Sequence, residues 1–150
     1  MKKRSGMAII EFTLMSSFLM VLLMSVLSVG YLIFSMQAVS ESVRVAARLA
    51  AVCQIGDDGV ATYVANNSYA ASLLAKNIEI EYLDADSNVL ATPDSAEVWF
   101  VRARAKDLNY QLMAILSFLG ENGVMDLSGF EMTIPSESLG LVPEGTNTDC

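Results

Sequence analysis

The feature that most constrains this chain is an uncharged run of 25 residues, from Phe12 to Met36. In a helix that rises about 1.5 Å per residue, such a run exceeds the roughly 20 residues that cross a bilayer. Leu and Met, which favour helix, account for ten of these residues, and the first proline of the chain is Pro93. The sequence therefore predicts one continuous membrane-spanning helix near its start.

Charge divides the sequence into two parts. A basic tip formed by Lys2, Lys3 and Arg4 precedes the apolar run, whereas the chain after Gln37 carries 16 acidic and 6 basic side chains. Basic residues flanking a membrane helix tend to stay in the cytoplasm, so we expect the remainder of the chain on the outer side of the cytoplasmic membrane. Its acidic surface argues against nucleic acid as a partner, because nucleic-acid binding needs clustered Lys and Arg.

Three interpretations of the N-terminal part compete. A cleaved secretory signal is one, with Ser28-Val29-Gly30 as the small-x-small cleavage site and Tyr31 as the new start. A plain single-pass anchor is the second, but it leaves Glu11 unexplained, because a carboxylate inside an apolar segment is disfavoured. In the third interpretation the chain is cut after Gly6, ahead of the apolar helix, and Glu11 has a function in the mature protein.

Gly6, followed by an apolar stretch with Glu11 as the fifth residue after it, resembles the class III leader of type IV prepilins. The resemblance implies cleavage after Gly6 by a prepilin peptidase, which leaves Met7 as the new N-terminus. The new ammonium group would then lie about one helical turn from Glu11, and a carboxylate there complements both this charge and the helix dipole. We expect Glu11 to pair with the Met7 ammonium of a neighbouring subunit and to set the axial stagger between the two.

A longer resemblance covers about the first 50 residues. The start Arg4-Ser-Gly6-Met-Ala-Ile-Ile-Glu11-Phe12, the later Tyr31-Leu-Ile-Phe34 and the segment Ala46-Ala47-Arg48 are similar to TadE-like pseudopilins of tight-adherence (Flp-type) pilus systems. This resemblance implies a minor pilin or pseudopilin that helps to assemble or cap a pilus used for surface adhesion. Its partners would be the prepilin peptidase, other pilin subunits and the pilus assembly platform. A pseudopilin of a secretion machine, or a single-pass membrane protein whose outer domain binds a partner, are the alternatives.

The expected fold is α+β, with a long pilin-like N-terminal helix followed by a small domain in which a helix packs on an antiparallel sheet. Its parts are a leader over residues 1–6, an apolar assembly helix over 7–52 and an extracytoplasmic domain over 53–150. Apolar residues recur at helical spacing beyond Met36, which predicts that the first helix continues outward: Val39, Val43, Ala46, Ala47 and Ala50.

The outer domain shows one more helix pattern and several strand patterns. Asp57 or Asp58 caps a predicted helix over residues 59–76, with Tyr63, Val64, Ala71 and Leu74 toward the core. Strands are predicted over 78–82, 99–105 and 130–134, with Trp99, Val101, Ala103 and Ala105 on one face of the second. Glu79 and Glu81 should lie opposite Arg102 and Arg104, which fixes the register. A short helix is expected over residues 108–119, and the tail from Leu141 to Asp149 is expected to be loose.

Nothing in the sequence indicates an enzyme, a cofactor or a metal site. The chain has no histidine, the usual base at neutral pH and the commonest metal ligand. Asp84 to Asn88 imitates the start of a calcium loop, but Val89 stands where that loop needs glycine, so we predict an ordinary turn. In an oxidising compartment Cys53 and Cys150 would form one disulfide. Two unpaired thiols, or a Cys150 that pairs between chains, are the alternatives. The apolar residues Phe118, Leu119, Val124 and Met125 indicate either core packing or a subunit contact.

Overall fold

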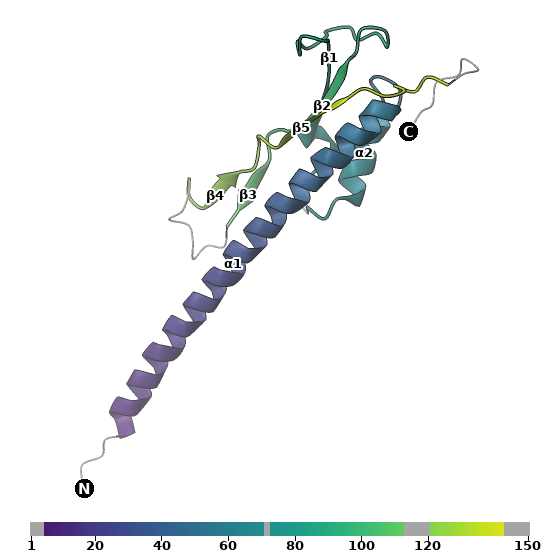
Figure 1. Ribbon diagram of the computed structural model, residues 1–150. Coiled ribbons are helices and arrows are strands. Elements are labelled where there is room, and N and C mark those ends of the chain that lie inside the picture. Colours follow the sequence, from purple (N-terminus) through teal and green to yellow (C-terminus); the bar gives the residue numbers. More distant parts are fainter. Residues whose placement is uncertain (1–4, 71–72, 113–120, 143–150) are drawn as a thin grey trace. The chain divides into compact units, whose positions relative to one another are not determined.

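The computed structural model describes residues 5–70, 73–112 and 121–142 (Figure 1). The chain divides into two compact units, Met1–Phe34 with Gln111–Met125, and Ser35–Tyr110 with Asp126–Cys150. Its architecture is α+β, with a long apolar helix followed by a helix and antiparallel sheets, as in pilins. The predicted fold class is therefore confirmed.

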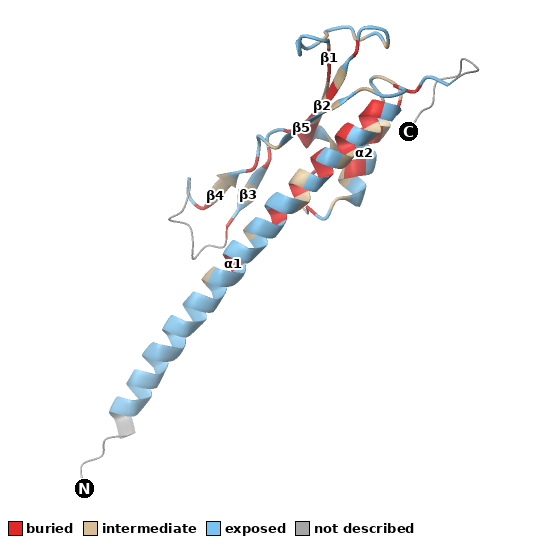
Figure 2. Cartoon of the chain, in the orientation of Figure 1, coloured by how far each residue is buried: buried red, intermediate tan, exposed pale blue. Residues whose placement is uncertain are grey.

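Helix α1 runs from Ser5 to Val52 without a break. Between Met7 and Met36 its large apolar side chains are mostly exposed, and this part of the helix is pale blue in Figure 2. From Val39 onward one face of α1 is buried in the core of the second unit. The five apolar residues that predicted this outward continuation of the helix are all buried. Three of them are alanines, so other elements can approach the helix backbone closely.

The core of the second unit forms between the end of α1, helix α2 and the sheet. It comprises Ala50, Ala51, Cys53, Val60, Tyr82, Val98, Val101 and Leu139, with partly buried residues such as Ile80 and Ile134 packed against them. Tyr82 contributes a polar atom to this core, and its hydroxyl accepts a hydrogen bond from the Gly56 amide at 3.2 Å. Burial raises the pKa of this phenol.

Helix α2 spans Asp58–Asn67 and is shorter than predicted. Asp57 is the N-cap, as one of the two predicted alternatives, and its carboxylate accepts from the Gly59 amide at 2.7 Å. The helix ends at Asn67 because Ser68 is extended and its hydroxyl accepts from the Ala70 amide, a local bond that competes with the helical pattern. The prediction that it continues to residue 76 is wrong, because residues 68–70 and 73–74 are not helical and the short 3-10 helix η1 spans Ala75–Asn77.

The predicted inward face of this helix is partly wrong as well. Val64 is buried, but Tyr63 is 53% exposed and Leu74, which lies beyond the true end of the helix, is 54% exposed. Ala71 lies outside the described residues. Leu74 was assigned to the core by a helical periodicity that ends at Asn67, whereas Tyr63 lies within α2 but outside its buried face, which Val60 and Val64 form.

A three-stranded antiparallel sheet, in the order β1-β2-β5, is built from Ile78–Leu83, Phe100–Ala105 and Glu131–Pro135. Glu79 faces Arg104 and Glu81 faces Arg102, so the predicted register is confirmed. The Glu79 carboxylate accepts from Arg104 Nε at 2.7 Å, and Glu81 lies 3.0 Å from Arg104 Nη2. These ion pairs cover one face of the sheet.

The opposite face of β2 packs into the core through Val101, Ala103 and Ala105, as predicted. Trp99 was placed on the same face but is 60% exposed. It precedes the first residue of β2, and its amide bonds to the Leu83 carbonyl rather than continuing the regular pairing. Alternation therefore begins one residue after the predicted start of the strand.

The other strands form a second sheet of two, β3 (Asn109–Gln111) and β4 (Val124–Asp126). The predicted helix over residues 108–119 is wrong for its described part, because residues 109–111 are extended; residues 113–119 lie outside the described residues. Val124 and Met125 are half-buried in β4, an element that the sequence patterns missed, whereas Phe118 and Leu119 are not described.

The segment from Ser136 to Gly140 closes the second unit by capping the end of α1. The Leu139 and Gly140 amides donate to the carbonyls of Ala51 and Val52, at 3.1 and 2.8 Å. The last carbonyls of a helix have no partner within the helix, so this segment satisfies groups that would otherwise lack one. Of the tail predicted to be loose, residues 143–149 lie outside the described residues.

Candidate functional site

The exposed apolar half of α1 is the feature of this protein that most calls for a partner. Exposed residues there include Met7, Ile10, Phe12, Phe18 and Leu19, each more than half accessible. A soluble monomer rarely exposes so large a contiguous apolar surface, so such a surface marks contact with a membrane or with other proteins. By length and composition, the helix over Met7–Val52 can span a membrane, a test that a signal sequence also passes.

Three hydroxyl groups on this half are compatible with an apolar environment. The hydroxyls of Thr13, Ser17 and Ser25 donate to backbone carbonyls three or four residues earlier, at 2.8–2.9 Å. A hydroxyl bonded in this way needs no water, so its cost in a bilayer or a helix bundle is small. These three hydroxyl groups therefore do not prevent burial of this surface.

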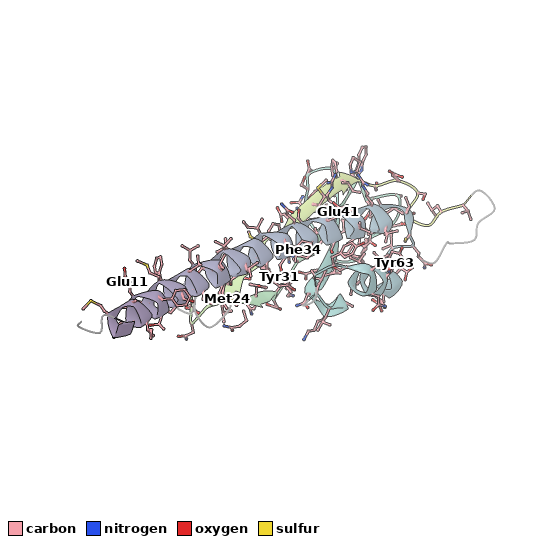
Figure 3. The ribbon with its side chains drawn as sticks, turned by 90° about the horizontal axis from the view of Figure 1, so that it is seen from below. Glu11, Met24, Tyr31, Phe34, Glu41 and Tyr63 are labelled. Atoms are coloured by element: carbon pink, nitrogen blue, oxygen red, sulfur yellow. The ribbon has the colours of Figure 1, made fainter. Side chains whose placement is uncertain are left out.

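Glu11 is the exception on this surface. Its side chain is exposed, near the N-terminal end of α1 (Figure 3), and within the described part of the chain it takes part in none of the ion pairs. In a continuous helix Met7 lies one turn before Glu11, about 6 Å along the axis. A charge at the N-terminus of Met7 would therefore be within reach of a carboxylate on the same helix or on a neighbouring one.

The remaining predicted site residues lie at or beyond the limits of the described ranges. Lys2, Lys3 and Arg4 are outside the described residues, and Gly6 is placed within α1. Cys53 is fully buried directly after the end of α1, whereas Cys150 is outside the described residues. The pairing of the two cysteines and the cleavage after Gly6 both stay predictions.

The segment that imitates a calcium loop forms a turn around Asp84. Asp84 accepts from the amides of Asp86 and Asn88, at 2.9 and 2.8 Å, and these bonds lower the pKa of its carboxyl. The carboxylate thus organises the predicted turn. Among the described residues no group of three or more His, Cys, Asp or Glu side chains could hold a metal ion.

Sequence reasoning missed one surface feature. A groove of about 260 Å³ lies between α1 and α2 in the second unit, lined by residues that include Glu41 and Ser42 on one side and Tyr63 and Tyr69 on the other. Tyr69 lies beyond the early end of α2, and Tyr63 is exposed within the helix, so the periodicity, which placed Tyr63 toward the core, gave no signal for this groove.

Comparison with known proteins finds a similarity in the N-terminal region. The family model described as TadE-like protein matches residues 6–48, a range that begins at Gly6 and includes Glu11 and Ala46-Ala47-Arg48. No curated protein and no solved structure matches the chain.

Proposed function

Because its N-terminal region is that of a TadE-like protein, we propose that this chain is a minor pilin or pseudopilin that acts in the assembly of a tight-adherence (Flp-type) pilus. The observation that carries the proposal is the coincidence of the family match, residues 6–48, with the exposed apolar part of α1. Residues 1–6 would be the leader, 7–52 the assembly helix and 53–150 the extracytoplasmic domain.

Insertion is the first step of the proposed mechanism. The run from Phe12 to Met36 crosses the bilayer, and Lys2, Lys3 and Arg4 stay in the cytoplasm. A prepilin peptidase then cuts on the cytoplasmic side after Gly6, which removes the basic tip and creates the ammonium group of Met7. The mature helix is thereby left with one positive and one negative group near its end, Met7 and Glu11.

Assembly is the second step. The apolar surface of α1 leaves the lipid by packing against the same surface of neighbouring subunits, and a repeated contact that does not close into a ring produces a filament. Glu11 buried in such a bundle needs a cation, and the Met7 ammonium of a neighbour supplies it. Glu11 and the Met7 ammonium of a neighbour can meet at only one axial offset between the two helices. This ion pair would therefore set the stagger between neighbouring subunits.

N-terminal sequencing and intact mass of the protein from membranes of its native host test the first step. A chain that starts at Met7 supports the proposal. A start at Met1 would support a single-pass anchored binding protein, and a start at Tyr31 an ordinary exported domain.

The second step is tested with Glu11→Gln, which keeps the size of the side chain and removes its charge. We expect unchanged cleavage and membrane insertion, but loss of the protein from sheared pilus fractions. Glu97→Gln, which removes an exposed carboxylate of the second unit that belongs neither to α1 nor to helix α2, is the matched control and should assemble normally. If Glu11→Gln assembles as the parent does, the assigned ion pair has no part in assembly.

The proposed Cys53–Cys150 disulfide joins the end of α1 to the last residue of the sequence. On the chain-entropy model a loop of this length would stabilise the domain by about 4–5 kcal/mol at most. Intact mass with and without reduction, followed by non-reducing peptide mapping, tests the pairing. Alkylation of both cysteines without prior reduction would exclude it.

A further inference from the structure

The groove between α1 and α2 is a candidate binding site that neither the apolar helix nor the family match explains. Its α1 side is formed by Ala38, Glu41, Ser42 and Val45, and its other side by residues from Tyr63 to Tyr69. Figure 3 shows Glu41 on α1 and Tyr63 on α2. All of these residues belong to the second unit, so the groove lies within one compact part of the molecule.

The two serine hydroxyl groups that line the groove, those of Ser42 and Ser68, already have hydrogen-bond partners within the protein. Ser42 Oγ donates to the Ala38 carbonyl at 2.8 Å and lies 2.7 Å from Ser68 Oγ, which also accepts from the Ala70 amide. A ligand therefore meets three other kinds of group: apolar side chains, two tyrosine rings and the Glu41 carboxylate. Tyr63 is 53% and Tyr69 85% exposed, values that leave both rings accessible.

The charges beside the groove are one carboxylate and one guanidinium. Arg44 Nη1 lies 3.5 Å from Glu41 Oε2, and both side chains are at least half exposed. Tyrosine rings and a carboxylate together attract an ammonium group, the rings through cation–π interaction. Arg44 does not line the groove, but its contact with Glu41 puts a guanidinium group beside it for a phosphate. This pattern complements a zwitterionic group that carries ammonium and phosphate together.

The position of the groove along α1 identifies where such a group is found. Ala38 to Val45 lie about 3–14 Å beyond Met36 along the helix axis. The run from Phe12 to Met36 is about 37 Å long and exceeds the hydrocarbon core of about 30 Å, so its end lies at the membrane surface. The headgroup layer occupies roughly the next 5–8 Å, which covers the inner part of the groove, from Ala38 to about Glu41, and tyrosine is enriched there in membrane proteins.

We propose that the groove between α1 and α2 binds the headgroup of an ammonium-bearing zwitterionic phospholipid of the outer leaflet, and so holds the second unit against the membrane before assembly. The proposal rests on the membrane insertion described above. Its preference is for ethanolamine over anionic headgroups that lack an ammonium group, because the two tyrosine rings and the Glu41 carboxylate attract that ammonium.

The test uses the full chain in nanodiscs that contain phosphatidylethanolamine and phosphatidylglycerol in equal amounts. Native mass spectrometry after release counts the lipids retained, and hydrogen exchange measures protection of the α2 amides. We expect at least about fivefold preference for phosphatidylethanolamine, since a cation–π contact and a carboxylate contribute together. Protection of α2 should be greater in phosphatidylethanolamine nanodiscs than in pure phosphatidylglycerol ones.

The informative variant is Tyr63→Leu with Tyr69→Leu, which keeps apolar area and removes both rings. It should reduce the preference to less than about twofold. Trp99→Leu, another exposed aromatic of the second unit but outside the groove, is the matched control and should keep it. Unchanged exchange of the β2 amides verifies that each variant is folded.

Several outcomes would overturn the proposal. Equal retention of the two lipids would mean that the groove does not distinguish their headgroups. An unchanged preference for phosphatidylethanolamine in the double variant would mean the same. Protection of α2 that depends on the number of chains per nanodisc, and not on lipid class, means that a second copy fills it. A chain that inserts and is cleaved at Gly6, yet shows no preference, refutes this inference alone, whereas failure to insert refutes the membrane role as well.

Discussion

Gly140 is the position where a single added methyl group tests the packing of the second unit most directly. Its φ is +78°, and a Cβ at this residue would lie 2.7 Å from Gln54 Cα and 2.8 Å from Gln54 N. Both atoms belong to backbone just after α1, so neither can rotate away. Gly140→Ala must therefore move the segment that caps α1.

The expected cost has two parts. A left-handed conformation costs a residue with a Cβ about 1–2 kcal/mol. Displacement of the segment would also weaken the bonds from Leu139 and Gly140 to the carbonyls of Ala51 and Val52, each of which contributes about 1 kcal/mol. We therefore expect Gly140→Ala to lower the free energy of opening of the second unit by about 3–4 kcal/mol.

Gly56→Ala is the matched control. Gly56 also has φ +78°, but no atom lies within 4 Å of the point that a Cβ would occupy, so only the conformational cost of about 1–2 kcal/mol applies. Hydrogen exchange of the β2 amides, in the full chain in detergent and at one fixed redox state, measures the free energy of opening for both variants. Equal effects of the two substitutions would refute the close approach of Gly140 to Gln54.

Two further predictions concern side-chain hydrogen bonds of the second unit. Asp57→Ala, which removes the N-cap of α2, should lower the free energy of opening of this helix by about 1 kcal/mol in hydrogen exchange, whereas Asp58→Ala should have a smaller effect. The hydrogen bond from Arg104 lowers the pKa of the Glu79 carboxyl in the folded protein. The pair therefore contributes its full stabilisation of the fold above the pKa that Glu79 has in the unfolded chain. This stabilisation is lost as the pH falls through the pKa of Glu79 in the folded protein. Thermal unfolding between pH 7 and pH 2 should therefore show a loss of stability below about pH 4.5 that is smaller in Glu79→Gln; an identical loss would contradict the role of this pair.

The elements that could be predicted are those with a local or a pairwise signal. The apolar run without proline predicted α1, and alternating Glu and Arg predicted the register of β1 on β2, because opposite charges face each other only in that alignment. The Asp84 turn was likewise visible, since its side chain bonds to its own backbone neighbours. In each case the residues that determine the structure lie within the element or directly across from it.

The elements that were missed depend on competition between local and tertiary bonds. Periodicity continued past Asn67, but Ser68 bonds locally to the Ala70 amide and, across the fold, to Ser42 on α1, a partner that could not be known from the segment itself. Asn77 shows the same effect, because its buried side chain bonds to the carbonyls of Lys106 and Asp107, both at 3.0 Å. Such long-range bonds decide where a helix ends, and no pattern of apolar residues contains them.

The same division between local and long-range signals separates the assembly residues of α1 from the groove between α1 and α2. Processing and assembly depend on Gly6, Met7 and Glu11, which lie close together in the sequence, so a motif is sufficient to propose them. The groove depends on Tyr63, which is exposed within α2 although Val60 and Val64 are buried, and on Tyr69, which lies beyond the end of α2 where a continued helix was predicted. The bond between Ser68 and Ser42 joins the chain after α2 to α1. The proposed headgroup site therefore requires a long-range contact that no motif contains.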